Sequence, residues 1–164
     1  MIKKIGIFYG STRGKTEYIA AILKNKLKDN PEIFDVSNGI EKIKDFDILI
    51  FLAPTYGAGQ LQEDWMRVMD DLKNTDFSNK KVGLIGRGNQ GFFAATFIDA
   101  IRDLYDIIIE NNGEVIGSTS LEGYSFEKSK SVINNKFIGL ALDEMFMMDE
   151  INEKLDNWIK NLGN

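Results

Sequence analysis

A polar stretch near the start of the chain, residues 11–16, carries the side chains best suited to hold an anion. Its hydroxyl groups can donate hydrogen bonds, its two basic residues supply positive charge, and its glycine lets the backbone come close to a ligand. The stretch consists of Ser11, Thr12, Arg13, Gly14, Lys15 and Thr16. A second glycine, Gly10, precedes it directly. This composition predicts a loop that cradles a phosphate group.

The elements on either side place this loop at the start of a helix. Ile5, Ile7 and Phe8 form the short apolar run of a buried strand. After Gly14, apolar residues recur at helical spacing, at Tyr18, Ile19, Ala21, Ile22 and Leu27. The first backbone N–H groups of a helix have no partner within the helix, and the helix dipole adds partial positive charge at that end. An anion is therefore stabilised there.

The same loop has three alternative explanations. A nucleotide triphosphatase loop has the pattern GxxxxGK[ST], and Gly14, Lys15 and Thr16 fit it. The first glycine of that pattern, however, would stand at position 9, which is Tyr9. A response-regulator receiver needs an acidic pair just after its first strand, whereas positions 8–11 are Phe, Tyr, Gly and Ser. A plain turn is the third alternative, and the direct succession of strand, loop and helix favours the phosphate loop over it.

Length and composition predict one domain, residues 1–164, which is long enough to bury most of the surface of its unfolded chain. A hydrophobic content of 43% with 27% charged residues is ordinary for a soluble globular protein. No apolar run is long enough to cross a bilayer, and the opening MIKK does not resemble a secretion signal. We therefore expect a cytoplasmic monomer that does not bind membranes.

The absence of cysteine and histidine narrows the chemistry further. It removes thiol nucleophiles, disulfides, most zinc sites and the commonest general base. We therefore predict neither a metal site nor a catalytic residue. With 20 basic and 25 acidic residues the net charge is −5, which argues against nucleic acid as a partner. An acidic surface suits basic protein partners instead.

Strands and helices alternate along the chain, which is typical of a parallel sheet with helices on both faces. The expected strands are residues 5–8, 33–36, 47–54, 80–86 and a last strand in two parts, 114–118 and 136–143. The expected later helices are residues 65–72, 97–109 and 147–162, the first of them with Trp65, Met66, Met69 and Leu72 on one apolar face. The pattern predicts a doubly wound, five-stranded parallel α/β sheet whose last strand is split by the polar loop 119–135.

In such folds the loops at the carboxyl ends of the strands gather around one crevice. Residues 10–16, 54–61 and 86–93 should therefore meet, and together they suit a phosphorylated planar ligand. The third loop also matches GxGxxG through Gly86, Gly88 and Gly91, the dinucleotide fingerprint. That fingerprint normally opens the first βαβ unit, so its position here argues against an NAD site.

Four motifs in this order resemble the flavodoxins, specifically the long-chain members. They are SxxGKT, APTYGAGQLQEDW, GRGNQ and EGYSFEKSKSVINNKFIGLALDE, and the resemblance covers nearly the whole chain. It implies a flavodoxin-like fold and one noncovalently bound FMN. It also implies a low-potential carrier of single electrons between redox proteins, with flavodoxin or ferredoxin reductase-type donors and acceptor oxidoreductases as partners, rather than an enzyme.

The resemblance also implies which residues hold FMN. Residues 11–16 would surround its phosphate. The inner side of the flavin ring would be bordered by Pro54, Thr55, Tyr56, Gly57 and Ala58, with Tyr56 stacking on it. The pyrimidine edge would be met by the third loop, at Gly86, Arg87, Gly88 and Asn89. Phe93 falls where the family has an outer stacking tyrosine, although Phe92 is an alternative for that role.

The chain departs from the family pattern at several of these positions. Arg13 replaces a hydroxyl residue, Asn89 stands where the family has Asp, and the run 145–150, MFMMDE, replaces a more polar one. Two other functions stay open. One is a flavodoxin-like NAD(P)H-dependent FMN or quinone reductase, and the other is an interaction module that has lost its cofactor.

Overall fold

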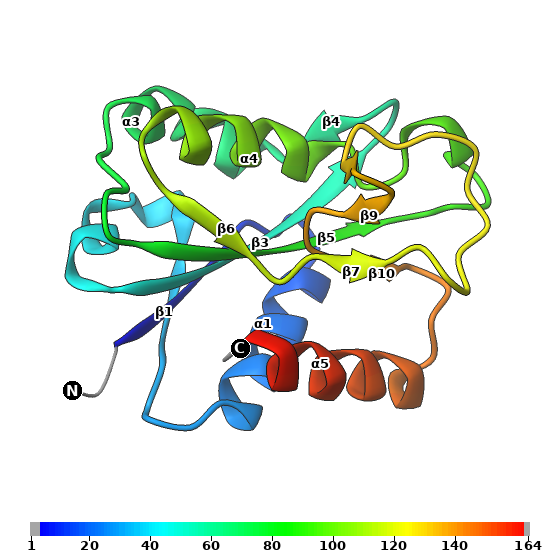
Figure 1. Ribbon diagram of the computed structural model, residues 1–164, viewed down its shortest axis with the longest axis horizontal. Helices are drawn as coiled ribbons and strands as arrows, with labels where there is room; N and C mark the ends of the chain where they lie inside the picture. Colours follow the sequence, from blue (N-terminus) through cyan, green and yellow to red (C-terminus); the bar gives the residue numbers. More distant parts are fainter. Residues whose placement is uncertain (1–3, 163–164) are drawn as a thin grey trace.

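The computed structural model describes residues 4–162, which form a sheet between two layers of helices (Figure 1). Five strands run parallel in the order β2-β1-β3-β5-β10. Their bounds are β1 Ile5–Tyr9, β2 Glu32–Asp35, β3 Ile48–Tyr56, β5 Lys81–Gly88 and β10 Leu140–Asp143. This order confirms the predicted doubly wound sheet. Central strand β3 is almost wholly buried because helices cover both of its faces.

Helices on the two faces enclose two separate cores. One face is covered by α1 (Lys15–Lys26) and α5 (Met148–Leu162), which lie below the sheet in Figure 1. The other face carries α2 (Glu63–Arg67), α3 (Met69–Lys73) and α4 (Ala100–Glu110). Shorter elements complete the chain: η1 Val36–Asn38, η2 Glu41–Asp45, β4 Gln60–Leu61 and η3 Ala94–Thr96. Strand β4 pairs antiparallel with the end of β3.

The last strand is split, as predicted. The first part, β6 (Glu114–Ile116), pairs with the beginning of β5, while β10 pairs with its end. Between these two pairings, residues 117–139 leave the edge of the sheet. They contain a small antiparallel sheet, β7 (Thr119–Ser120), β9 (Lys136–Phe137) and β8 (Val132–Ile133). We call residues 119–135 the insert.

Three large apolar residues within the expected helices are exposed. Tyr18 on α1, Met66 on α2 and Ile109 on α4 are each 46–59% exposed. The predicted helix at 65–72 is also interrupted, since α2 ends and α3 begins at Val68. Met66 is exposed while Trp65 is buried, because neighbouring residues in a helix project about 100° apart. The expectation that both share one packed face was therefore wrong.

Candidate functional site

Two neighbouring cavities open at the carboxyl edge of the sheet. The larger, of about 440 Å³, is lined by Ser11, Thr12, Arg13, Lys15, Thr16, Tyr56, Arg87 and Glu144. The smaller, of about 310 Å³, shares Arg13, Lys15, Arg87 and Glu144 with it. Its apolar lining comes from α1, from the end of β10 and from the start of α5. Residues from all three predicted loops thus come together, as the topology of the sheet requires.

The loop of residues 10–16 leaves most of its donors free for a ligand. Gly14 takes a positive φ of 84° directly before α1, and an added Cβ there would meet no atom within 4 Å. Its N–H donates to Ser11 Oγ over 2.9 Å, which holds the turn. Gln62 Nε2 donates to Thr12 Oγ1 over 3.3 Å from the neighbouring connection. Thr16, in the first turn of the helix, is buried. The open helix N-terminus suits an anion.

Three cations converge on this loop without an acidic partner. Among residues 4–162, no carboxylate forms an ion pair with Arg13, Lys15 or Arg87. Arg87 is half-buried near the end of β5, level with Leu142 of β10, which belongs to the core beneath α1 and α5. Its side chain therefore reaches the α1 side of the sheet. Unpaired cations around one cavity of an acidic protein favour an anionic ligand.

The second loop supplies one wall of the larger cavity. Tyr56, half-buried at the end of β3, lines the cavity. Thr55 points away from it, because its buried Oγ1 accepts a hydrogen bond from Ala100 N at 3.2 Å. Gly57 has a φ of 52° and is exposed with Ala58. Of the predicted residues 54–58, only Tyr56 lines either cavity.

The third loop uses its polar groups to hold its own shape. The buried Asn89 side chain accepts hydrogen bonds through Oδ1 from the backbone N–H groups of Gly91, at 3.1 Å, and Phe92, at 2.9 Å. Its Nδ2 donates to Glu144 Oε2 over 3.5 Å. Neither Asn89 nor Phe93 lines a cavity.

The glycines of this loop lie against the core. A Cβ on Gly86 would meet Ile98 at 3.0 Å, and one on Gly88 would meet the same residue at 3.3 Å. Because these glycines have no side chain, β5 can pack closely against the segment before α4. Of the predicted third-loop residues, Arg87 alone lines the cavities, and Gly86 and Gly88 lie beneath the site.

The connection after β10 joins the site, which the sequence reasoning missed. Glu144 lines both cavities, and its N–H donates to Gly88 O over 2.8 Å. The buried carboxylate of Asp143 accepts from Gln90 N at 3.1 Å and from Met145 N at 2.8 Å. A signal was present, because this acidic pair directly follows the last apolar strand. The rule that gathers loops at the carboxyl edge applies to that strand as well.

Two tyrosines near the site have perturbed ionisation. Burial, and then the charges of Asp35 and Glu17, raise the pKa of Tyr9 above its usual value. Burial also raises the pKa of Tyr124 in the insert, with smaller contributions from Glu150 and Asp143. Both phenols are therefore neutral at physiological pH and act as uncharged packing or hydrogen-bonding groups.

Other kinds of site find no support in the described part of the chain. Residues 4–162 hold no cluster of three or more acidic side chains that could bind a metal ion. None of the helices in this range has the length and apolar character needed to cross a membrane. A phosphate loop, an aromatic wall and unpaired cations define an α/β protein that binds a phosphorylated planar ligand at the carboxyl edge of its sheet.

Comparison with known proteins identifies the family to which this chain belongs. The chain belongs to the flavodoxin family, whose model, described as Flavodoxin, matches residues 7–158. The flavodoxin of Buchnera aphidicola is 42% identical over 164 residues, which covers 98% of this chain and 96% of that protein. A Nostoc flavodoxin is 38% identical over 99% of this chain and 96% of its own length.

The chain is also similar to a solved crystal structure. The crystal structure of Fusobacterium nucleatum flavodoxin bound to flavin mononucleotide superposes with a TM-score of 0.94. Its sequence is 39% identical, and the match covers 99% of this chain and 98% of that one. These relatives confirm the flavodoxin-like fold and the resemblance inferred from the four motifs. Family membership also identifies an electron-transfer protein rather than an enzyme.

Proposed function

We propose that this protein binds one FMN and carries single electrons at low potential between redox proteins. FMN supplies the one-electron chemistry when bound. The observation that carries the proposal is the larger cavity, where residues 11–13, 15 and 16, Tyr56 and Arg87 line one space of about 440 Å³. The FMN-bound state of the Fusobacterium relative supports the same conclusion.

The residues present fit FMN at both of its ends. The helix N-terminus, the hydroxyls of Ser11, Thr12 and Thr16, and the guanidinium groups of Arg13 and Arg87 would hold the phosphate dianion. Tyr56 would stack on the flavin ring, and the backbone of Pro54, Thr55, Gly57 and Ala58 would border its inner side. Phe93 would cover its outer side from the third loop, where Gly86, Gly88 and Asn89 maintain the backbone.

The partners we propose are redox proteins of the flavodoxin or ferredoxin reductase type as donors, and oxidoreductases as acceptors. We also propose that the chain is a single-domain monomer of the cytoplasm. The reductase alternative is not favoured, since the relatives are named flavodoxins. Aerobic consumption of NAD(P)H by the purified protein alone would contradict the carrier function.

The test of the cofactor compares FMN with riboflavin. Apoprotein is titrated with each flavin and quenching of flavin fluorescence is followed. Only FMN brings the phosphate, so we expect it to bind more than about 100-fold more tightly, since two charge-assisted hydrogen bonds alone provide that factor. The holoprotein should be yellow with one FMN per chain. Equal affinity for riboflavin would exclude residues 11–16 as the phosphate site.

A further inference from the structure

A buried amide side chain, that of Gln62, lies directly beneath residues 10–16. It precedes α2, and none of its surface is exposed. A Cβ on Gly10 would collide with Gln62 Oε1, because the start of α2 packs closely against the loop. Trp65 Cδ1 would lie 2.6 Å from the same added atom. A buried polar group is costly unless it is hydrogen-bonded, so each polar atom of this amide should have a partner.

The partners of Gln62 determine which way its amide faces. Oε1 accepts hydrogen bonds from the backbone N–H groups of Asp64, at 3.1 Å, and Trp65, at 3.3 Å, and so caps the first turn of α2. Nε2 donates to Asp64 Oδ2 over 2.8 Å and to Thr12 Oγ1 over 3.3 Å. If the amide were turned over, its oxygen would face a carboxylate oxygen and its N–H groups would face two other N–H groups. The network therefore allows only this orientation.

This orientation decides the role of the Thr12 hydroxyl group. A hydroxyl has one hydrogen to donate and two lone pairs that accept. Because Gln62 Nε2 can only donate, Thr12 Oγ1 must accept on that side, and its own hydrogen points elsewhere. Within residues 4–162 the Thr12 hydroxyl donates to no protein group, and Thr12 lines the larger cavity. Its hydrogen is therefore available to a ligand there, and a hydroxyl that accepts a hydrogen bond is a stronger donor.

The neighbouring hydroxyl, that of Ser11, follows the same pattern. Ser11 Oγ accepts a hydrogen bond from Gly14 N over 2.9 Å, and Ser11 also lines the larger cavity. Two consecutive hydroxyls thus use a lone pair toward the protein and keep a hydrogen for the cavity. The cations Arg13 and Lys15 beside them add further donors. A fully ionised phosphate monoester, whose three terminal oxygens only accept, is the ligand that matches these donors.

We propose that Gln62 is a positioning residue for the FMN phosphate. Its amide holds Thr12 Oγ1 as an acceptor on the protein side and thereby directs the hydroxyl hydrogen into the cavity. This inference rests on the proposed function, since the phosphate is that of FMN. It also links the two ends of the site, because Gln62 belongs to the connection between β3 and α2, whose residues 54–58 would border the flavin ring.

The test reverses these hydrogen bonds without changing the net charge. In Gln62→Glu/Asp64→Asn, one carboxylate oxygen at position 62 can still cap α2, and the other accepts from the amide at position 64 and from the Thr12 hydroxyl. The hydroxyl hydrogen then points away from the cavity. Apoprotein is titrated with FMN and with riboflavin, and the ratio of the two dissociation constants gives the preference for FMN. We expect this preference to fall about tenfold or more, the value of one hydrogen bond to a charged group.

Thr12→Val shows whether Gln62 acts through Thr12. Valine has no hydroxyl, so this variant alone should lower the preference for FMN about tenfold. Thr12→Ser should keep the wild-type preference. In the Thr12→Val background, the exchange at positions 62 and 64 should change the preference by no more than about twofold, because no hydroxyl is left to turn. Fully multiplicative effects would overturn the proposal, since Gln62 would then act independently of Thr12. A wild-type preference in Thr12→Val, or in the exchange variant, would overturn it as well.

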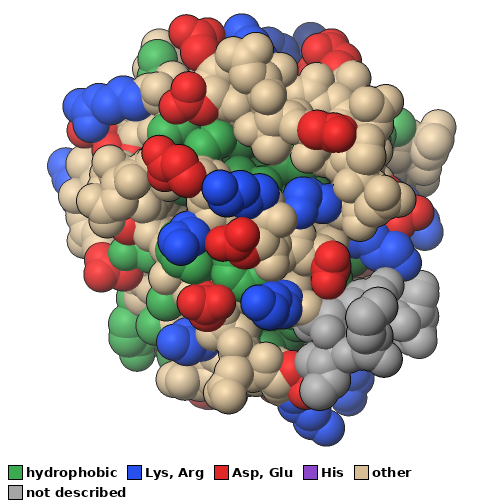
Figure 2. Space-filling model, turned by 90° about the vertical axis from the view of Figure 1, so that its left-hand side faces the viewer, with side chains coloured by type: hydrophobic (Ala, Val, Ile, Leu, Met, Phe, Trp, Pro, Cys, Tyr) green, Lys and Arg blue, Asp and Glu red, His purple; other side chains and the backbone are tan. Residues whose placement is uncertain are grey.

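The matched control exchanges an amide and a carboxylate at α3. Asp70→Asn/Asn74→Asp also keeps the net charge, and neither residue lines the two cavities. Helix α3 lies at the opposite end of the molecule (Figure 1), where acidic and basic side chains are interspersed (Figure 2). This variant should therefore keep the wild-type preference for FMN. If it loses the preference as the first exchange does, the placement of charge rather than the bonds of Gln62 is responsible, and the proposal is overturned.

Binding of riboflavin shows whether each variant is folded, because riboflavin brings no phosphate. If the exchange variant binds neither flavin, Gln62→Met takes its place. A hydroxyl without a donor beside it can occupy any of three staggered positions, so the preference for FMN should fall about threefold, and only while Thr12 is present. An unchanged preference in Gln62→Met would then overturn the proposal. Failure of the proposed function would look different, as a wild-type protein that binds riboflavin as tightly as FMN.

Discussion

The two ends of the cofactor cavity are built in opposite ways. The proposed phosphate end is a run of consecutive residues, 11–16, whose hydroxyls, N–H groups and cations mostly lack partners among residues 4–162. The flavin-ring end is assembled from connections far apart in sequence, and its polar side chains are bonded to the protein itself. Asn89 and Asp143 each accept two backbone N–H groups there.

Polar residues at the two ends therefore have different roles, since some bind the ligand and others fix the shape of the loops. An unpaired donor at the rim of a cavity is available to a ligand, whereas a side chain already bonded to its own loop fixes where the backbone runs. Substitutions at the phosphate end should therefore change affinity for FMN. Substitutions at the ring end should leave affinity closer to wild type and change the reduction potentials.

The largest effect is expected at the phosphate end. Arg13→Ala/Arg87→Ala should weaken FMN binding about 100-fold, because each guanidinium provides a charge-assisted hydrogen bond worth about 1.5 kcal/mol or more. Riboflavin binding should hardly change, since it brings no phosphate. The measurement is fluorescence titration of the apoprotein with both flavins.

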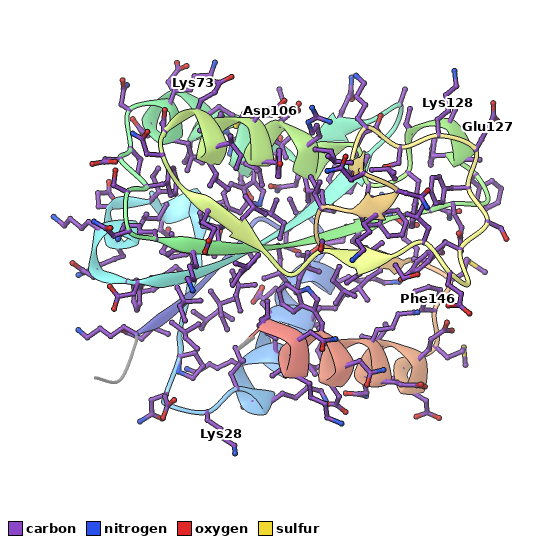
Figure 3. All side chains as sticks on the ribbon, in the orientation of Figure 1. Lys28, Lys73, Asp106, Glu127, Lys128 and Phe146 are labelled. Atoms are coloured by element: carbon purple, nitrogen blue, oxygen red, sulfur yellow. The ribbon has the colours of Figure 1, made fainter. Side chains whose placement is uncertain are left out.

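The control for this variant removes two cations elsewhere. Lys28→Ala/Lys73→Ala changes the net charge equally, and both lysines lie far from the site in Figure 3. Its FMN affinity should stay within about twofold of wild type, because surface charges beyond a Debye length are screened. If it weakens binding as much as the arginine variant does, the effect is one of total charge and the two ends do not differ as described.

An intermediate effect is expected from Asn89→Asp. The new carboxylate can accept the same bonds from Gly91 and Phe92, so the loop should keep its shape while it gains a negative charge beside Glu144. At a separation of about 6 Å and an effective dielectric constant near 20, one charge is worth roughly 3 kcal/mol, an upper value for a partly solvated edge. The second reduction potential should therefore fall by on the order of 100 mV or less.

Potentiometric titration at low and high salt measures both couples of this variant. The second potential should fall more at low salt, and the first should move less, because only the second electron gives the flavin a net negative charge. Asn134→Asp in the insert is the control, and its potentials should equal those of wild type. A second potential that rises or stays constant in Asn89→Asp would show that residue 89 does not influence the flavin.

The smallest effect is expected at Gly57. Its φ of 52° is strained for a β-branched residue, although a Cβ would have room, with Gln60 Oε1 as its nearest neighbour at 3.7 Å. We expect Gly57→Val to destabilise the one-electron-reduced state by about 1 kcal/mol, which lowers the first potential by roughly 40 mV. Asparagine tolerates positive φ, so Gly57→Asn should restore the wild-type value. Equal first potentials in all three proteins would exclude a backbone role for residue 57.

The sequence by itself was sufficient for the architecture and for the position of residues 11–16 at the start of a helix. Strands and helices follow from the period at which apolar residues recur, and that period is a local property. Residues 11–16 are adjacent in the chain, so the helix that begins beside them already determines where their donors point. The split of the last strand was predictable because two apolar runs, 114–118 and 136–143, flank one polar stretch.

Only the tertiary structure decided which side chains line the cavity and which instead form hydrogen bonds that hold the surrounding loops in place. Asn89 bonds to Glu144 across 55 residues of sequence. Arg87 lines one cavity with residues 11–16 because β5 and β1 belong to one parallel sheet and Arg87 points to the face that α1 covers. Met66 is exposed although Trp65, its neighbour in the same short helix, is buried. Such outcomes depend on strand register and on packing between distant segments, and no local pattern of residue types encodes them.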